Sequence, residues 1–223
     1  FYNCSGLASV TLPAGITGIG AYAFSGCADL AELVLPESTV SVGENAFSGC
    51  EKLIEKEGGV SYVGKWAIDC DESAVTVQLR ADTVGIADNA FYGCREMTSI
   101  TIPEGVAGIG AEAFYNCAAL TTVAIPGGVE NIGYGAFYGC AELTDITLPA
   151  GVESIGRDAF NGCTKLADVA LPANLTEIGD YAFYNCDGLT SVTIPGGVAA
   201  IGVSAFEDCD GLTSVTISEG VES

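Results

Sequence analysis

The chain has no histidine, and only seven of its 223 residues are lysine or arginine, against 29 that are aspartate or glutamate. Its formal charge of -22 repels nucleic-acid phosphate and anionic lipid, because such partners bind clustered basic side chains. Apolar runs long enough to cross a bilayer are also missing. We therefore expect neither nucleic-acid binding nor membrane insertion within these residues.

What the chain does contain is a Phe-x-x-Cys step that recurs about every 23 residues. All nine phenylalanines belong to it: Phe1, Phe24, Phe47, Phe91, Phe114, Phe137, Phe160, Phe183 and Phe206. Self-similarity at a fixed period of this length is typical of stacked rungs, each of which buries its apolar face only against its neighbours. The sequence thus predicts one elongated solenoid over residues 1–223, of about ten rungs.

One rung, from Leu120 to Cys140, shows how the chain is expected to fold locally. Val123 and Ile125 alternate with polar or small residues, which is the pattern of a short half-buried strand. Pro126 ends that strand, because proline cannot donate a ladder hydrogen bond. A second extended piece follows, then Gly133 in a conformation that disfavours a Cβ, then one helical or 3₁₀ turn.

The full rung pattern, L-x-x-V-x-I-P-x-x-V-x-x-I-G-x-x-A-F-x-x-C, resembles the 23-residue leucine-rich repeats of BspA-like bacterial surface proteins. The stretch from Ile102 to Cys117 is close to the consensus of that family. The resemblance implies an arc with a parallel β-sheet on its concave face and short β, 3₁₀ or helical turns on its outer face. It also implies a non-enzymatic binding module, part of an adhesin at the cell surface or secreted.

Nine of the ten cysteines occupy one column of the repeat. We interpret them as buried free thiols that act as small apolar residues. Disulfides between neighbouring rungs are the alternative, since one strand spacing of about 4.8 Å falls within the permitted Cα separation. Without histidine or close Cys-x-x-Cys pairs we predict no metal site, and Asp69, Asp71 and Glu72 lack EF-hand spacing. No cofactor is expected.

Residues 51–90 break the repeat, because they keep Cys70 but lose the Ala-Phe pair. Two short extended runs about a turn predict a hairpin that carries the single tryptophan of the chain. Trp66, Tyr62 and Lys65 could form a binding knob on this irregular rung. The alternative is that Trp66 fills the space left by the missing phenylalanine.

Smaller departures occur at Thr39-Val40 and Thr83-Val84, where the apolar residue after the turn is displaced by one position. A bulged turn is expected there. The chain also starts and stops in mid-rung, so we expect it to be a fragment of a longer array, with possible end-to-end self-association.

Outward positions of the first strand of each rung are expected to line up in columns. One column contains Thr122, Asp145, Asp168 and Ser191, a shallow platform with an acidic spot that could bind a ligand. The alternative is that threonine and serine simply suit exposed strand positions. Acid-base catalysis by Asp145 and Asp168 would need a pocket that separates their pKa values, and the sequence predicts none.

Tyrosines gather near the Ala-Phe step, where they could form an outer aromatic patch or pack against the next rung. The leading prediction is therefore a non-enzymatic surface or secreted module that binds proteins or glycans of a host or neighbouring cell. The alternative is a structural spacer that presents another domain.

Overall fold

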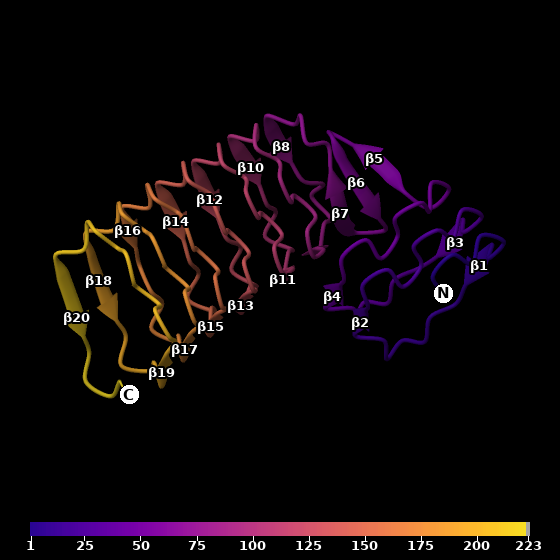
Figure 1. The fold of residues 1–223 in the computed structure, drawn as a ribbon. Coiled ribbons are helices and arrows are strands. Elements are labelled where there is room, and N and C mark those ends of the chain that lie inside the picture. The colour runs from indigo at the N-terminus through magenta and orange to yellow at the C-terminus, as the bar shows by residue number, and fades with distance from the viewer. Residues whose placement is uncertain (222–223) are drawn as a thin grey trace.

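The computed structural model describes residues 1–221, which form stacked rungs running from the N-terminus to the C-terminus (Figure 1). The first strand of each rung belongs to what we call the first column: β1 (Ser9–Val10), β3 (Glu32–Leu33), β8 (Thr76–Gln78), β10 (Ser99–Thr101), β12 (Thr122–Ala124), β14 (Asp145–Thr147), β16 (Asp168–Val169), β18 (Ser191–Ile194) and β20 (Ser214–Ile217).

A second column runs along the opposite long edge of the stack in Figure 1. It comprises β2 (Gly18–Ile19), β4 (Ser41–Val42), β9 (Gly85–Ile86), β11 (Gly108–Ile109), β13 (Asn131–Ile132), β15 (Ser154–Ile155), β17 (Glu177–Ile178) and β19 (Ala200–Ile201). Strands pair in parallel within three sheets of the first column (β1 with β3, β8 to β16, β18 with β20) and three of the second (β2 with β4, β9 with β11, β13 to β19). Equivalent residues of paired rungs face each other, as Thr122 faces Asp145. The solenoid architecture predicted from the 23-residue period is confirmed.

The third side of each rung, around the Phe-x-x-Cys step, consists of turns, and residues 1–221 contain no helix. The expected helical or 3₁₀ turn is therefore wrong. The backbone N–H of Phe114 donates to the carbonyl of Ala136 in the next rung at 2.8 Å, so it is not available to a helix. Glu112 and Asn116 also adopt positive φ angles, which interrupt any right-handed helical run.

The glycine after the second strand is needed for a different reason from the backbone conformation that we predicted. Gly133 does not adopt a positive φ. The equivalent Gly179 shows the general reason for a glycine here, because an added Cβ would lie 2.5 Å from the backbone nitrogen of Arg157 in the preceding rung. Close approach of successive rungs, not backbone conformation, thus selects glycine at this position.

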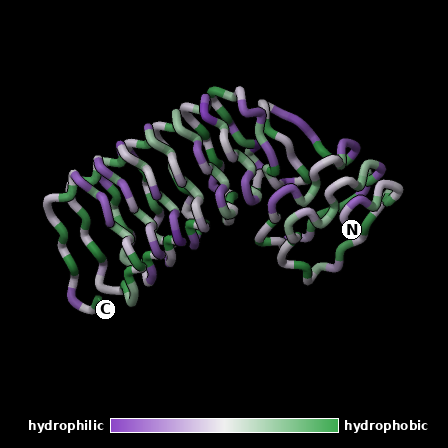
Figure 2. The backbone as a smooth tube through the Cα atoms, viewed as in Figure 1, coloured by the Kyte–Doolittle hydropathy of each residue, from purple (hydrophilic) through white to green (hydrophobic). Residues whose placement is uncertain are grey.

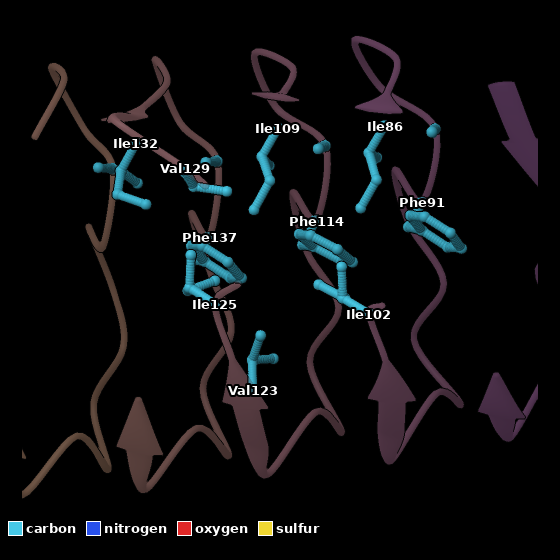
Figure 3. Close-up of a cluster of buried hydrophobic side chains, with 14 of the residues drawn as sticks. Ile86, Phe91, Ile102, Ile109, Phe114, Val123, Ile125, Val129, Ile132 and Phe137 are labelled. Atoms are coloured by element: carbon cyan, nitrogen blue, oxygen red, sulfur yellow. The ribbon is translucent and has the colours of Figure 1, made fainter. Parts of the chain in front are cut away.

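Apolar side chains point into the stack and form continuous layers (Figure 3). Phe114 and Phe137 stack with ring centroids 5.1 Å apart and planes 7° apart. Burying one such side chain contributes about 1.5–3 kcal/mol, and only the adjacent rungs can provide that burial. Figure 2 shows hydrophobic positions recurring along successive rungs, as a continuous core requires.

All ten cysteines are free thiols, as predicted, and most are buried in this core. The Cys163 thiol donates to the carbonyl oxygen of Phe137, 26 residues earlier, at 3.2 Å. Burial raises the pKa of the Cys163 thiol well above its ordinary value, so this thiol stays protonated as a donor. The same bond recurs at Cys27, Cys50, Cys117, Cys140, Cys186 and Cys209.

The irregular segment contains β5 (Glu55–Glu57), β6 (Val60–Val63) and β7 (Trp66–Cys70), which form an antiparallel meander. Strand β7 then pairs in parallel with β9 of the following rung, so the hairpin is continuous with the second column. Figure 1 shows it between the two N-terminal rungs and the long C-terminal stack. No helix within the described residues could cross a membrane.

Candidate functional site

The predicted first-column platform is present but interrupted. Thr122, Asp145 and Asp168 lie in register on successive strands, and all three side chains are exposed. Ser191 is exposed as well, but its strand β18 pairs with β20 and not with β16. A shallow cavity of about 540 Å³ lies at this seam, with Asp168 and Ser191 among its lining residues.

Asp145 and Asp168 are cross-strand neighbours on this open surface. Two like charges in this arrangement repel each other and create a local negative potential. The shallow surface around them does not enclose the pair. The arrangement suits contact with a cationic group of a partner better than proton transfer.

The predicted knob on the hairpin is only partly formed. Lys65 is exposed at the tip between β6 and β7, where a ligand can reach it. Trp66 is 4% exposed, and its ring lies over Gly85 and Gly108, so the indole is buried against the second column. Because Trp66 pairs with Gly85 while Ala67 pairs with the inward Ile86, it takes an outward strand position and not the place of the missing phenylalanine.

Tyr62 is fully buried and cannot touch a ligand, so its expected role as a contact residue is not supported. Its hydroxyl accepts a hydrogen bond from the backbone N–H of Arg80 at 3.3 Å, and the Arg80 guanidinium lies 4.2 Å from its ring centroid. Burial raises the pKa of Tyr62. Arg80 stands where regular rungs have proline, and only a residue with a backbone N–H can make this contact.

A cavity of about 1060 Å³ lies beside the hairpin, and we call it the groove. It lies where the second N-terminal rung is close to β11, and Figure 1 shows β4 of that rung beside β11. A Cβ on Gly108 would lie 3.1 Å from the carbonyl oxygen of Val40. Its lining includes Val34, Leu35, Pro36, Glu37, Thr39, Val40, Lys65, Trp66, Val84, Ile109, Glu130 and Asn131.

Apolar side chains are unusually exposed in the groove. Val34 is 82% exposed, Val40 69% and Val84 36%. Glu37 and Glu130 carry negative charge at its rim, against the single positive charge of Lys65. The groove therefore combines aliphatic walls with a net negative potential, and sequence reasoning did not place it.

A row of stacked tyrosines marks the third side. Tyr115 lies 4.9 Å from Tyr92 and 4.5 Å from Tyr138, measured between ring centroids, with nearly parallel planes. The tyrosines thus pack against those of the next rungs, and the stacked faces are not open to a sugar ring. Among residues 1–221, no group of three or more cysteine, aspartate or glutamate side chains is placed to hold a metal ion.

The three-sided stack, the 23-residue register and the inward Phe-x-x-Cys step define a leucine-rich-repeat type of parallel β-solenoid. Its sequence matches the family model described as BspA type Leucine rich repeat region, in six copies over residues 1–75 and 130–223. The chain belongs to this family. A search among curated proteins finds no match.

Several solved bacterial leucine-rich repeat structures are similar to this chain. The Treponema pallidum protein TpLRR is 33% identical, over 68% of this chain and 73% of that one, with a TM-score of 0.65. A Bacteroides ovatus protein is 27% identical over 98% of this chain, at a TM-score of 0.58, and this chain spans 57% of it. A Eubacterium ventriosum protein shares the fold at 19% identity, 98% and 79% coverage, and a TM-score of 0.59.

Proposed function

We propose that this chain is a non-enzymatic recognition module of a bacterial cell-surface or secreted protein, and that it binds proteins or glycans of a host or neighbouring cell. Membership of the BspA-type family supports a surface repeat protein. The observation that carries the proposal is the groove, because a regular stack does not require an apolar cavity of about 1060 Å³ at its one irregular rung.

Two features of the surface support recognition over catalysis. Repeat proteins of this kind present extended surfaces on a rigid scaffold, so affinity arises from area and from multiple copies. The exposed carboxylates Asp145 and Asp168 lie on an open strand surface that admits water. Enzymes depend on preorganised dipoles in a site that excludes water, and this open surface does not form such a site.

A structural spacer is the competing function, since the rung-to-rung packing alone would make a stiff rod. A spacer requires no special surface, so exposed residues could be exchanged in any column without effect. A recognition module requires at least one surface whose exchange abolishes binding. The exposed valines of the groove favour a recognition module, because a spacer gains nothing from them.

The test is a binding screen of the immobilised chain against arrays of extracellular-matrix proteins and surface glycans. The screen includes an Asp145→Lys, Asp168→Lys variant for the first column and a Val34→Thr, Val40→Thr, Val84→Thr variant for the groove. Saturable binding that one variant abolishes supports the proposal. If folded protein binds nothing on the arrays, or if neither variant alters the binding, the proposed recognition function is contradicted.

A further inference from the structure

We propose that the groove beside the hairpin binds a polypeptide segment that carries apolar side chains flanked by lysine or arginine. This inference rests on the proposed recognition function and specifies its site and the chemistry of its partner. It is carried by an exchange of inward and outward residues in the two rungs beside the hairpin, and by the charge at the rim of the groove.

In regular rungs an apolar residue points inward after the turn, and a small or polar residue follows it outside. Examples are Val106-Ala107, Val129-Glu130, Val152-Glu153, Leu175-Thr176 and Val198-Ala199. Only the two rungs beside the hairpin reverse this order, with Thr39-Val40 before it and Thr83-Val84 after it. Both displaced valines line the groove.

The reversal is unfavourable for the stack by itself. Thr39 is only 7% exposed, and its hydroxyl oxygen is buried without a hydrogen-bond partner among residues 1–221. Val40, which would suit that inward position, is 69% exposed. A buried unpaired hydroxyl and an exposed valine both work against folding, and departures of this kind are expected at functional sites.

A third valine extends the apolar wall. Val34 occupies the outward first-column position that holds threonine in several other rungs, including Thr11 and Thr101. Together Val34, Val40 and Val84 line one cavity from the two rungs that flank the hairpin. A volume of about 1060 Å³ exceeds that of most small-molecule pockets, roughly 300–1000 Å³, so several side chains of a segment can enter together.

Charge selects the flanking residues of that segment. Glu37 and Glu130 line the groove with one opposing Lys65, and the chain as a whole carries -22. This potential attracts basic segments over about a Debye length and repels acidic ones. Lysine or arginine beside the apolar anchors complements both the rim and the overall field.

A polypeptide suits the groove better than a glycan. Sugar rings pack on open aromatic faces, and the one aromatic residue in the lining, Trp66, is only 4% exposed. The remaining apolar walls are valine, leucine, isoleucine, alanine and proline side chains. Aliphatic walls of this kind gain most by excluding water from an apolar side chain.

The test uses a seven-residue synthetic peptide of alternating lysine and leucine, titrated while the fluorescence of Trp66 is followed. Trp66 is the only tryptophan and borders the groove. Two comparison peptides replace leucine with serine or lysine with glutamate. Saturable binding of the Lys-Leu peptide, roughly tenfold or more tighter than either comparison peptide and weakened by salt, is expected.

The variant Val34→Thr, Val40→Thr, Val84→Thr keeps side-chain shape and charge, and other rungs already have threonine at the equivalents of all three residues, as Thr11 and Thr17 show. It should weaken binding roughly tenfold or more. The matched controls Val75→Thr and Val203→Thr change valines that are exposed outside the groove, and they should leave the affinity unchanged.

Absence of Lys-Leu binding, equal binding of the serine peptide, or equal affinity of the triple variant would overturn the inference. A partner in the array screen that is lost only in the Asp145→Lys, Asp168→Lys variant would also overturn it, while the recognition function would stand. If the chain binds nothing on the arrays but binds the Lys-Leu peptide as expected, the result would count against the proposed function and not against the peptide site. The two proposals therefore fail separately.

Discussion

The Sγ atom of Cys140 lies 3.2 Å from the carbonyl oxygen of Phe114, one rung earlier, and donates a hydrogen bond to it. In seven rungs this bond links the cysteine to the phenylalanine of the rung before. A thiol suits this place because it is small and apolar yet supplies a donor to a buried carbonyl. Alanine would leave that carbonyl with only the backbone N–H of Cys117, which donates to it at 3.2 Å.

We expect Cys140→Ala to lower the free energy of unfolding by about 1–2 kcal/mol, because it removes a buried hydrogen bond and leaves a small cavity. Urea denaturation followed by circular dichroism measures the change. Cys4→Ala is the control, since Cys4 has the same place in the repeat but is exposed. Equal effects of the two substitutions would contradict the role of the buried thiol.

Thiol titration should find ten reactive groups per chain in denaturant without reductant, because all ten cysteines are free. In the folded protein, Cys4 should react first and the buried thiols slowly, since a thiol reacts as its exposed thiolate. Four or five disulfides, detected as missing thiols, would show that neighbouring rungs are covalently linked and that this description of the column is wrong.

Stability should fall in alkaline solution. Burial raises the pKa of Cys140 to about 12, and it also raises the pKa values of Cys117, Cys163 and Cys186. Unfolded thiols ionise near pH 8.5, so above that pH the unfolded chain releases protons that the folded chain retains. The stabilisation is complete below about pH 8 and is lost as pH rises toward 12, by about 1.4 kcal/mol per pH unit for each such thiol.

Urea denaturation at pH 7, 8, 9 and 10 measures this loss. Cys140→Ala removes one of the titrating groups, so its stability should decline less steeply with pH than that of the wild-type chain. A free energy of unfolding that stays constant to pH 10 would show that these thiols ionise equally easily in both states.

Arg80 should anchor the hairpin to the stack. Its guanidinium forms ion pairs with Glu55 and Glu57 of β5, each at 2.7 Å, and its side chain is 19% exposed. We expect Arg80→Ala to lower the free energy of unfolding by about 1–3 kcal/mol and to shift Trp66 emission to longer wavelength as the hairpin loosens.

The control for Arg80→Ala is Lys52→Ala, which removes an ion pair with Asp29 in which both side chains are more than half exposed. Such surface pairs contribute about 0–1 kcal/mol. If the two variants lose the same stability and leave Trp66 emission unchanged, Arg80 does not hold the hairpin.

The rung architecture was predictable from sequence because every residue in a rung repeats the environment of its counterpart 23 positions away. Thr122, Asp145 and Asp168 could be placed on one surface from spacing alone, and they are in register. The helical turn was wrong, because local spacing does not reveal that Phe114 donates its N–H to the next rung. Inter-rung bonds replace intra-rung ones there.

The groove could not be predicted, because it brings Val34 and Val40 near Asn131, about ninety residues further along the chain. That approach depends on how the hairpin of residues 60–70 displaces the N-terminal rungs, and the repeat gives no rule for it. A signal was present in the Thr39-Val40 and Thr83-Val84 order. By itself that order predicts only a bulged turn.

In the arrangement we propose, regular rungs form the scaffold, and the reversed residue order beside the hairpin forms the binding site. Its most direct test restores the regular order with Thr39→Val, Val40→Thr and measures the affinity for the Lys-Leu peptide, with urea denaturation as the check on folding. The reverse exchange in a regular rung, Val198→Thr, Ala199→Val, is the control and should cost stability without changing affinity. We expect the restored variant to be more stable by about 1 kcal/mol and to bind the peptide more weakly. A restored variant that is less stable than the wild-type chain and binds the peptide equally well would contradict it.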